Sequence, residues 1–378
     1  YVPGKNDIPD LFNLWRGWNV EARPGNCQLF LDHVLNNICG EDPIYFAYLL
    51  NWMARAVQEP HKAGETAIVL RGDQGTGKSF FANAFGHLFG RHYLTISNAK
   101  HLVGNFNAHM RDLSVLFADE AFFAGDKAHE GVLKTLVTGE SITIEMKGFD
   151  LEEVPNRLHL IMASNSDWVI PAGGNERRFL VLDVGDDQRQ IVGYFKEIKD
   201  QLEAGGYEAL LHMLMTRDVT GFDVRKVPQT EALRTQKMLS QTPMEQWWHQ
   251  KLVDGNILAH HSEWEAVVEC NSVFLDYARD AQIAGITRRG SQIAFGRFLG
   301  KACQNGKRPT ELERVQRRYS KQIDGEDTDK RTASRAYYYV MPSLERCRAL
   351  WEKKHGAIDW PEPIRFDSTQ EMTDDEVF

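Results

Sequence analysis

The sequence predicts an α/β fold, in which a parallel sheet is flanked by helices, with an N-terminal helical segment and a C-terminal winged-helix-like module. Between residues 61 and 205, short apolar runs alternate with helical patterns, which is typical of parallel sheets. From residue 206 this alternation weakens, and helical patterns and a basic hairpin follow. The 378-residue chain has 42% hydrophobic and 26% charged residues, a composition that excludes an intrinsically disordered protein. No apolar run approaches the roughly 18 residues of a membrane-spanning helix, so we expect no membrane contact.

Residues 1–60 are expected to form a helical segment that acts in oligomerisation or as a collar. In the stretch DPIYFAYLLNWMARAVQ, apolar side chains recur at helical spacing, among them Leu49, Leu50, Met53 and Val57. A stripe of this kind needs an apolar partner surface. The helix is therefore expected to support the next domain or a neighbouring subunit.

The central region, residues 61–205, contains short apolar runs that we interpret as strands. Their length and their β-branched side chains suit buried strands. The runs are TAIVL at 66–70, VLFA at 115–118, ITIEM at 142–146, LHLIMAS at 158–164 and FLVLDV at 179–184.

Residues 206–355 are expected to form the winged-helix-like module. Amphipathic patterns predict helices over 262–281, 291–303 and 343–354, and an aromatic run predicts a strand over 333–342. Residues 356–378 form an acidic tail that we expect to be disordered.

The net charge of −9 conceals a basic region. Residues 284–354 hold 17 Lys or Arg against 8 Asp or Glu, which favours contact with a polyanion. The spacing of Arg314, Arg317, Arg318 and Lys321 predicts one basic helical face, which we assign to DNA binding. The alternative is a solvated surface without a ligand.

Cysteine usage and the first residues indicate the setting of the protein. The five cysteines form no metal-binding spacing and are typical of a reducing, cytoplasmic compartment. The chain starts without an initiator Met, so we expect it to be part of a longer protein.

The most specific motif is GDQGTGKS at 72–79, which fits the phosphate-binding loop (P-loop) pattern G-x-x-x-x-G-K-[ST] between a predicted strand and a predicted helix. The glycines allow backbone N–H groups to approach phosphate oxygens. Lys78 is expected to contact the β- and γ-phosphates of ATP, and Ser79 to ligate Mg²⁺. The expected nucleotide-contacting residues of the loop are Gly72, Gly75, Thr76, Gly77, Lys78 and Ser79.

Two carboxylates, Asp119 and Glu120, follow a predicted buried strand about 40 residues after the loop. Asp119 is expected to bind the nucleotide-associated Mg²⁺ together with Ser79. Glu120 is expected to orient and polarise the attacking water. This second carboxylate favours hydrolysis of ATP over phosphoryl transfer to a hydroxyl group.

Three further polar residues complete the predicted catalytic set. Asn165 ends the strand LHLIMAS, where an amide can bind both the γ-phosphate and the lytic water. Arg177 and Arg178 precede the next strand. They could form a surface salt bridge, or one of them could be an arginine finger for the ATP of a neighbouring subunit.

The order of these motifs resembles that of superfamily 3 helicases, a viral and plasmid branch of the AAA+ ATPases. The stretch from LKTLVTGESITIEMKGFD to ERRF is similar to the helicase half of phage and prophage primase-helicases, and the similarity covers residues 10–200. It implies an AAA+ fold and a homo-oligomeric, usually hexameric, ring that hydrolyses ATP between subunits and moves along single-stranded or forked DNA. It also implies a primase-polymerase domain in the full-length chain.

The same resemblance places Lys147 and Phe149 at a DNA-touching β-hairpin. A lysine at a hairpin tip can pair with a phosphate, and a phenylalanine can pack on sugar or base. The alternative is an exposed turn lysine without a ligand.

Three functions compete on these observations. The leading one is an ATP-driven helicase of phage or mobile-element replication. An AAA+ initiator or packaging motor would engage duplex DNA without unwinding it. A nucleotide-sensing DNA-binding adaptor would need no hydrolytic set, so Glu120, Asn165 and the arginine pair argue against it.

Overall fold

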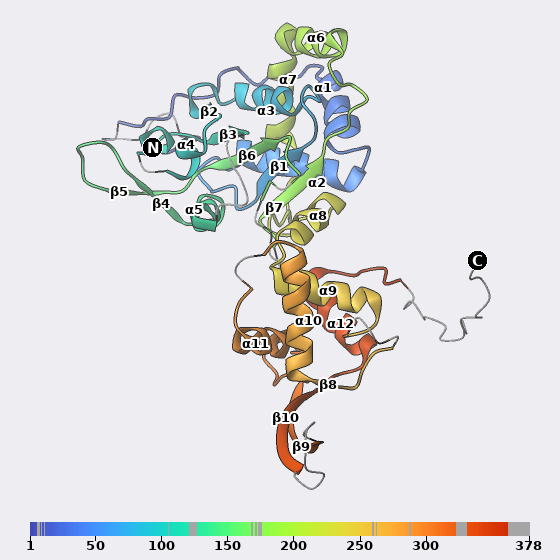
Figure 1. The fold of residues 1–378 in the computed structure, drawn as a ribbon. Helices are drawn as coiled ribbons and strands as arrows, with labels where there is room; N and C mark the ends of the chain where they lie inside the picture. The colour runs from blue at the N-terminus through green and yellow to red at the C-terminus, as the bar shows by residue number, and fades with distance from the viewer. Residues whose placement is uncertain are drawn as a thin grey trace, which may run out of the picture. The chain divides into compact units, whose positions relative to one another are not determined.

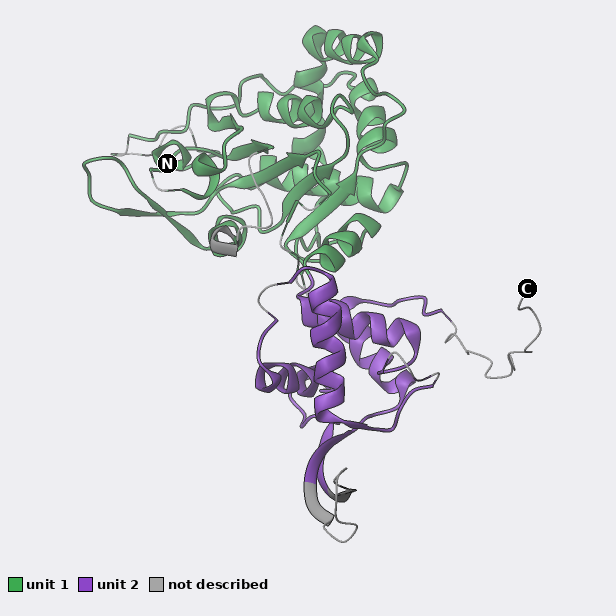
Figure 2. Ribbon diagram, in the orientation of Figure 1, with its two compact units in different colours: residues 1–240 green, residues 241–378 purple. Residues whose placement is uncertain are grey.

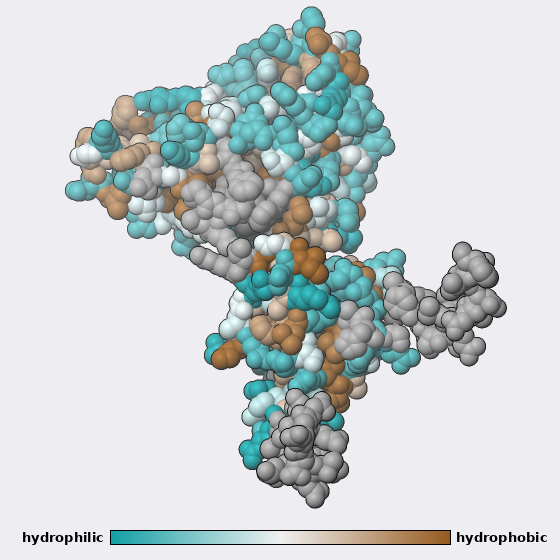
Figure 3. Space-filling view, in the orientation of Figure 1, coloured by the Kyte–Doolittle hydropathy of each residue, from teal (hydrophilic) through white to brown (hydrophobic). Residues whose placement is uncertain are grey.

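The computed structural model describes the chain except for residues 6–7, 9, 11, 105, 121–126, 168, 171, 173–175, 259–260, 262, 287–288, 323–330 and 362–378, and except for the side chains of 127–129, 318–322 and 331–334. It divides into two compact units, Tyr1–Ser240 and Gln241–Phe378 (Figure 2). Most of the predicted acidic tail lies outside the described residues. No helix in the described part of the chain is long and apolar enough to cross a membrane. Both units are largely hydrophilic on the face shown in Figure 3, with small scattered apolar groups.

The first unit is built on five parallel strands in the order β2-β3-β6-β1-β7 (Figure 1). This confirms the predicted α/β class. The strands are β1 Ala67–Arg71, β2 Tyr93–Ile96, β3 Val115–Asp119, β6 His159–Ser164 and β7 Phe179–Asp183. The edge strand β2 was not predicted, because only Ile96 of its four residues is buried and its apolar signal is weak.

The apolar run at 142–146 is not part of the parallel sheet, contrary to the expectation. Strand β4 (Ser141–Ile144) pairs antiparallel with β5 (Glu152–Pro155) in a separate hairpin. Only alternate residues of β4, Ile142 and Ile144, are buried. This alternation is that of a strand with one solvated face, which suits a hairpin better than the centre of a parallel sheet.

The N-terminal helices share one hydrophobic core with the sheet. Trp52 is fully buried and donates from Nε1 to the Thr66 carbonyl (2.9 Å), while the Phe30 ring stacks on Phe81 at 6.2 Å. Residues 28–58 are thus integral to the first unit; their role in oligomerisation or as a collar stays a prediction. The helices of this unit are α1 Gln28–Asp32, α2 Pro43–Gln58, α3 Lys78–His87, α4 Ala99–Val103, α5 Lys127–Thr138, α6 Val192–Gln201, α7 Tyr207–Thr216 and α8 Glu231–Leu239, with a π-helical turn at His33–Ile38.

The boundary between the units differs from the expected one at residue 205. Helix α7 buries Leu210, Leu211 and Leu214 in the same core as α2. Helix α8 packs against β7, and the hydroxyl of its N-cap residue Thr230 donates to the Val181 carbonyl (2.6 Å). Residues 206–240 therefore belong to the first unit.

The second unit begins with the element order helix, strand, helix, helix, strand, strand of a winged helix, and a final helix follows. Its antiparallel sheet has the order β8-β10-β9. The predicted helix at 262–281 is correct only from residue 270, because its first part forms β8. The elements are α9 Pro243–Asp254, β8 Val267–Glu269, α10 Cys270–Ile283, α11 Gln292–Ala302, β9 Glu313–Gln322, β10 Arg331–Val340 and α12 Leu344–His355.

The predicted basic helical face is wrong, because Arg314, Arg317, Arg318 and Lys321 lie on strand β9. This strand pairs with the tyrosine-rich β10 along its whole length. In a strand, Arg314 and Arg317 point to opposite faces. The side chains of Arg318 and Lys321 lie outside the described residues.

Candidate functional site

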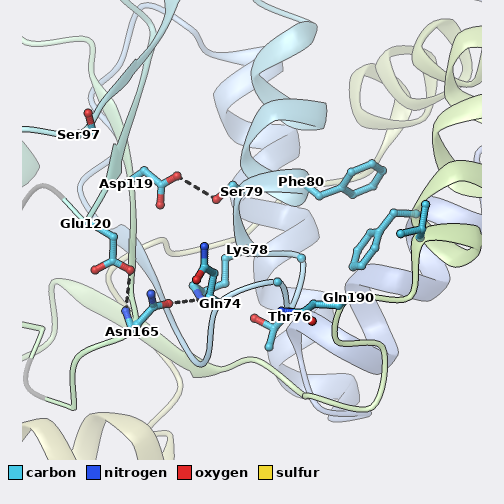
Figure 4. Close-up of a pocket in the computed structure, with 14 residues that line it drawn as sticks. Gln74, Thr76, Lys78, Ser79, Phe80, Ser97, Asp119, Glu120, Asn165 and Gln190 are labelled. Atoms are coloured by element: carbon cyan, nitrogen blue, oxygen red, sulfur yellow. Dashed lines mark hydrogen bonds between the residues drawn. The ribbon is translucent and has the colours of Figure 1, made fainter.

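The loop at 72–77 connects β1 to α3 at the carboxyl edge of the sheet (Figure 4). Gly72, Gly75 and Gly77 have φ angles of 152°, 84° and 99°, a region that favours glycine. A Cβ at Gly77 would lie 2.6 Å from the His33 ring. The glycines therefore permit both the turn and the close approach of the N-terminal helices.

The loop forms one wall of a cavity of about 730 Å³. The opposite walls come from the ends of β3 and β6, and an apolar flank comes from Phe80, Val192 and Phe195. Of the predicted nucleotide-binding and catalytic residues, the cavity brings together Gly75, Thr76, Gly77, Lys78, Ser79, Asp119, Glu120 and Asn165.

The ammonium group of Lys78 is held by three acceptors. It donates to the backbone oxygens of Gly72 (2.6 Å) and Asp73 (2.7 Å) and to Oδ1 of Asn165 (2.9 Å). Burial lowers the pKa of Lys78, and the nearby carboxylates of Glu120 and Asp119 oppose that shift. The lysine is thus positioned beside the loop, where a phosphate group could replace these acceptors.

Ser79 and Asp119 form the pair that could hold Mg²⁺. The Ser79 hydroxyl donates to Oδ2 of Asp119 at 2.9 Å, across the gap between α3 and β3. Hydroxyl and carboxylate oxygens are the protein ligands that Mg²⁺ accepts when phosphate and water complete its shell. The donor set therefore fits a nucleotide-associated magnesium ion.

Glu120 is exposed to solvent and held in a fixed orientation by strand β6. Its Oε1 accepts from the Asn165 backbone N–H (2.8 Å), and its Oε2 accepts from the Ser164 hydroxyl (3.2 Å). Its backbone adopts φ of 54° while its N–H donates to the Ala163 carbonyl (2.9 Å). A positive φ at a non-glycine residue is strained, and residues held in such conformations cluster at active sites.

The sheet order explains why Asn165 is central. Strand β6 lies between β1, which leads into the loop, and β3, which carries the carboxylates. Asn165 follows β6 directly and contacts Lys78 with its side chain and Glu120 with its backbone (Figure 4). One residue thus connects the phosphate-loop lysine to the carboxylate.

Arg177 and Arg178 lie at the amino-terminal ends of the parallel strands, whereas the loop follows the carboxyl-terminal end of β1. The Arg178 carbonyl accepts from the N–H of Ala67, the first residue of β1, whereas the loop follows the last residue of that strand. Arg178 pairs with the buried Glu176 at 3.1 Å. Arg177 is exposed, and none of the described residues forms an ion pair with it. Neither arginine is among the residues that line the cavity of its own chain.

Four residues that sequence reasoning missed complete the site. Asn37 donates from Nδ2 to the Thr76 carbonyl (2.6 Å), and the Gln190 N–H donates to the Gly75 carbonyl (3.1 Å). Burial lowers the pKa of His33 to about 4, so its ring packs on the loop uncharged. Phe195, the fourth, lines the apolar flank. In the sequence, His33 and Asn37 could have been noticed as polar residues inside an apolar helical stretch. Gln190 and Phe195 gave no such signal.

The turn between β4 and β5 presents Lys147 and Phe149 to solvent, as the hairpin prediction requires. The Phe149 side chain is 71% exposed. Asn107 fixes the base of the hairpin, since its amide donates to the Thr143 carbonyl (2.8 Å) and accepts from the Glu145 N–H (2.8 Å). The hairpin projects from the first unit, away from the loop at 72–77 (Figure 1).

Comparisons with known proteins give relatives for this fold. Residues 70–178 match a family described as a family of unknown function (DUF5906). The DNA primase-polymerase of Nitratiruptor phage NrS-1 is 25% identical over 154 residues, which are 40% of this chain and 21% of that protein. A structure of the apo NrS-1 C-terminal region aligns with a TM-score of 0.61 at 17% identity, over 85% of this chain and 77% of that one. A second apo structure of that region, in its A form, gives 0.56 at 19% identity, over 74% and 70%.

The chain is therefore an α/β protein with a five-stranded parallel sheet and with distant sequence similarity to a phage DNA primase-polymerase. The particular relative is the NrS-1 primase-polymerase, whose C-terminal region has the same fold. The sequence match spans about a fifth of that relative's length.

Proposed function

We propose that the protein is an ATP-dependent DNA helicase of phage or mobile-element replication, working as a homo-oligomeric, hexameric ring on single-stranded or forked DNA. One observation carries this proposal: Lys78, Asn165 and Glu120 are connected by hydrogen bonds in a single cavity. This set combines phosphate binding, phosphate sensing and water activation. The link to phage DNA primase-polymerase supports the DNA substrate and a primase-polymerase domain in the full-length protein.

Each residue has a distinct part in hydrolysis. Lys78 binds the β- and γ-phosphates. Ser79 and Asp119 would hold a Mg²⁺ ion, which would neutralise phosphate charge. Glu120 accepts a proton from the attacking water. Asn165 gives up its contact with Lys78 when phosphate arrives and then binds the γ-phosphate.

The position of Arg177 supports action between subunits. Arg177 lies at the amino-terminal ends of the strands, and the loop lies at their carboxyl-terminal ends. The arginine can therefore contribute only to the ATP site of another chain. Its lack of an ion pair among the described residues leaves the guanidinium available. Arg178 forms an ion pair with Glu176, and its role is to stabilise the fold.

ATPase activity with and without single-stranded DNA, measured beside strand displacement on a forked duplex, tests the proposal. We expect turnover that DNA stimulates, and displacement that requires ATP. Stimulated turnover without displacement would instead indicate the initiator or packaging motor. Negligible turnover at saturating ATP and DNA would indicate the nucleotide-sensing adaptor.

Phe195→Ala is expected to raise the KM for ATP about tenfold, because losing a stacked ring costs roughly 1–3 kcal/mol. The ring lies in the apolar flank of the cavity, beyond the loop, where a base would lie. Inhibition of ATPase activity by inorganic tripolyphosphate should be unchanged, since this compound has no base. The Phe195→Tyr variant keeps the ring and serves as the control. Equal loss of ATP and tripolyphosphate binding would mean that Phe195, which contacts the His33 ring at 5.7 Å, only shapes the loop.

Lys147→Ala is expected to leave basal ATPase activity within about twofold of wild type while abolishing strand displacement and most stimulation by DNA, because it removes one phosphate contact per subunit. Phe149→Ala should act in the same direction more weakly. The control is Lys226→Ala, which removes an equally exposed lysine away from the hairpin. Normal unwinding by Lys147→Ala would exclude the hairpin as the DNA contact. Loss of basal turnover would instead assign the turn to the ATP site.

A further inference from the structure

Helix α11 of the second unit has a buried face and a basic outer face. Phe295 and Leu299 are fully buried in the core of this unit. Ile293, Arg297 and Lys301 are exposed and spaced four residues apart, so they lie along one side of the helix. Ile293 is 70% exposed, so its apolar side chain is available for contact on this side of the helix.

The packing around α11 uses its inner face and leaves the outer face exposed. The Phe295 ring stacks on Tyr277 of α10 with centroids 5.0 Å apart and an interplanar angle of 17°. A Cβ at Gly296 would lie 2.9 Å from the Tyr339 hydroxyl, so glycine allows α11 to approach strand β10 closely. In the helix-turn-helix arrangement, the second helix of such a pair is the one that enters the DNA major groove.

One face of the β9–β10 hairpin continues this surface. Residues paired directly across an antiparallel ladder share a face, and Tyr339, which meets α11, pairs with Arg314. Alternation along β10 puts Tyr337 and Arg335 on the same face. The Arg314 guanidinium lies 4.0 Å from the Tyr337 ring centroid. A basic and aromatic hairpin face thus adjoins the basic helix.

Charge on the second unit is distributed unevenly. Residues 291–310 contain four Lys or Arg and no Asp or Glu. Neither Arg297 nor Lys301 forms an ion pair with any residue that the structure describes. In contrast, three acids elsewhere in the unit are neutralised internally, in the pairs Glu245–Lys354, Asp276–Lys251 and Glu311–Arg346.

We propose that the second unit binds duplex DNA, with α11 in the major groove and the hairpin on the flanking backbone. Arg297 and Lys301 can contact guanine edges or phosphates, and Ile293 can contact a thymine methyl group. Single-strand binding depends on exposed aromatic rings for stacking. Both aromatic residues of α11, Phe295 and Phe298, are buried or half-buried, and the exposed Tyr337 ring on the hairpin is covered by the Arg314 guanidinium. This binding needs no nucleotide and does not rest on the proposed helicase function.

The test measures binding of the full chain, without nucleotide, to a 24-base-pair duplex and to a 24-nucleotide single strand. We expect the Arg297→Ala, Lys301→Ala double variant to lose at least tenfold in duplex affinity at low salt. The slope of the logarithm of the affinity against the logarithm of the salt concentration should decrease by the equivalent of about two phosphate contacts. Single-strand affinity should stay within about twofold, because the two substituted side chains are proposed to contact the groove and backbone of a duplex. Arg335→Ala should weaken duplex binding by a smaller factor.

Two controls keep the result specific. The Lys196→Ala, Lys199→Ala double variant removes the same charge from exposed positions on α6 and should bind duplex like wild type. Unchanged thermal unfolding of the α11 variant would show that its fold is intact, as the exposure of both side chains predicts. Unchanged duplex affinity, or equal losses for duplex and single strand, would overturn the proposal. Because no ATP is present, neither result depends on whether the protein unwinds DNA.

Discussion

Replacing Glu120 by glutamine is expected to lower kcat for ATP hydrolysis by at least about 10²-fold, within the range assigned to general acid–base catalysis, while ATP still binds. Glutamine keeps an oxygen that can accept from the Asn165 N–H, so the local structure should persist. It cannot take a proton from water at neutral pH. The loss should therefore appear in kcat, with the affinity for ATP close to that of wild type.

The contrast is with Lys78→Ala, which should weaken nucleotide binding itself. That substitution removes the positive charge next to the loop and leaves three acceptors, among them Asn165 Oδ1, without their donor. Steady-state hydrolysis together with equilibrium binding of labelled ATP separates the two effects. Glu263→Gln, at an exposed site in the second unit, is the matched control for loss of a carboxylate. Hydrolysis near the wild-type rate by the Glu120 variant would assign water activation to another residue.

Arg177→Ala is expected to reduce turnover by about 10³-fold or more, the usual effect of removing an arginine finger. The side chain is exposed, so thermal stability should hardly change. Arg178→Ala should leave turnover close to that of wild type but lower the thermal stability. It leaves the buried Glu176 without its ion-pair partner, so the melting temperature should fall.

Mixing two inactive variants tests whether the arginine acts on a neighbour. In random 1:1 assemblies of Arg177→Ala and Lys78→Ala chains, about a quarter of the interfaces in a closed ring combine an intact loop with an intact arginine. We therefore expect activity to return to as much as about this fraction of wild type, although each parent alone is inactive. An inactive mixture, with mixed assembly verified by mass, would contradict action between subunits.

Local motifs explain how much of the site could be predicted. Gly72 to Ser79, Asp119, Glu120 and Asn165 each follow a short apolar strand, and parallel strands bring their carboxyl ends to one edge. Their convergence was thus implied by the fold class. His33, Asn37, Gln190 and Phe195 belong to no motif, and only long-range packing brings them to the loop.

The basic residues of β9 show why the other errors arose. The spacing of Arg314, Arg317, Arg318 and Lys321 fits a helix, but exposed charges carry no information about which face is buried. The paired strand β10, with Tyr337, Tyr338 and Tyr339 in succession, decides the structure through its high strand propensity. Similarly, β4 was placed in the main sheet because an apolar run alone does not specify its partner.

The interior position of β1, between β6 and β7, affects how the protein folds during synthesis. Its two neighbours, β6 and β7, begin at residues 159 and 179, so both edges of β1 stay unpaired while about 90 further residues are made. At ribosomal rates this interval is on the order of ten seconds, during which an apolar strand with open edges is prone to aggregate. A shortened chain limited to 70–178 would cut into β1 and omit β7, which leaves one edge open permanently. Any truncated version intended to fold must therefore extend through β7 and retain the N-terminal helices.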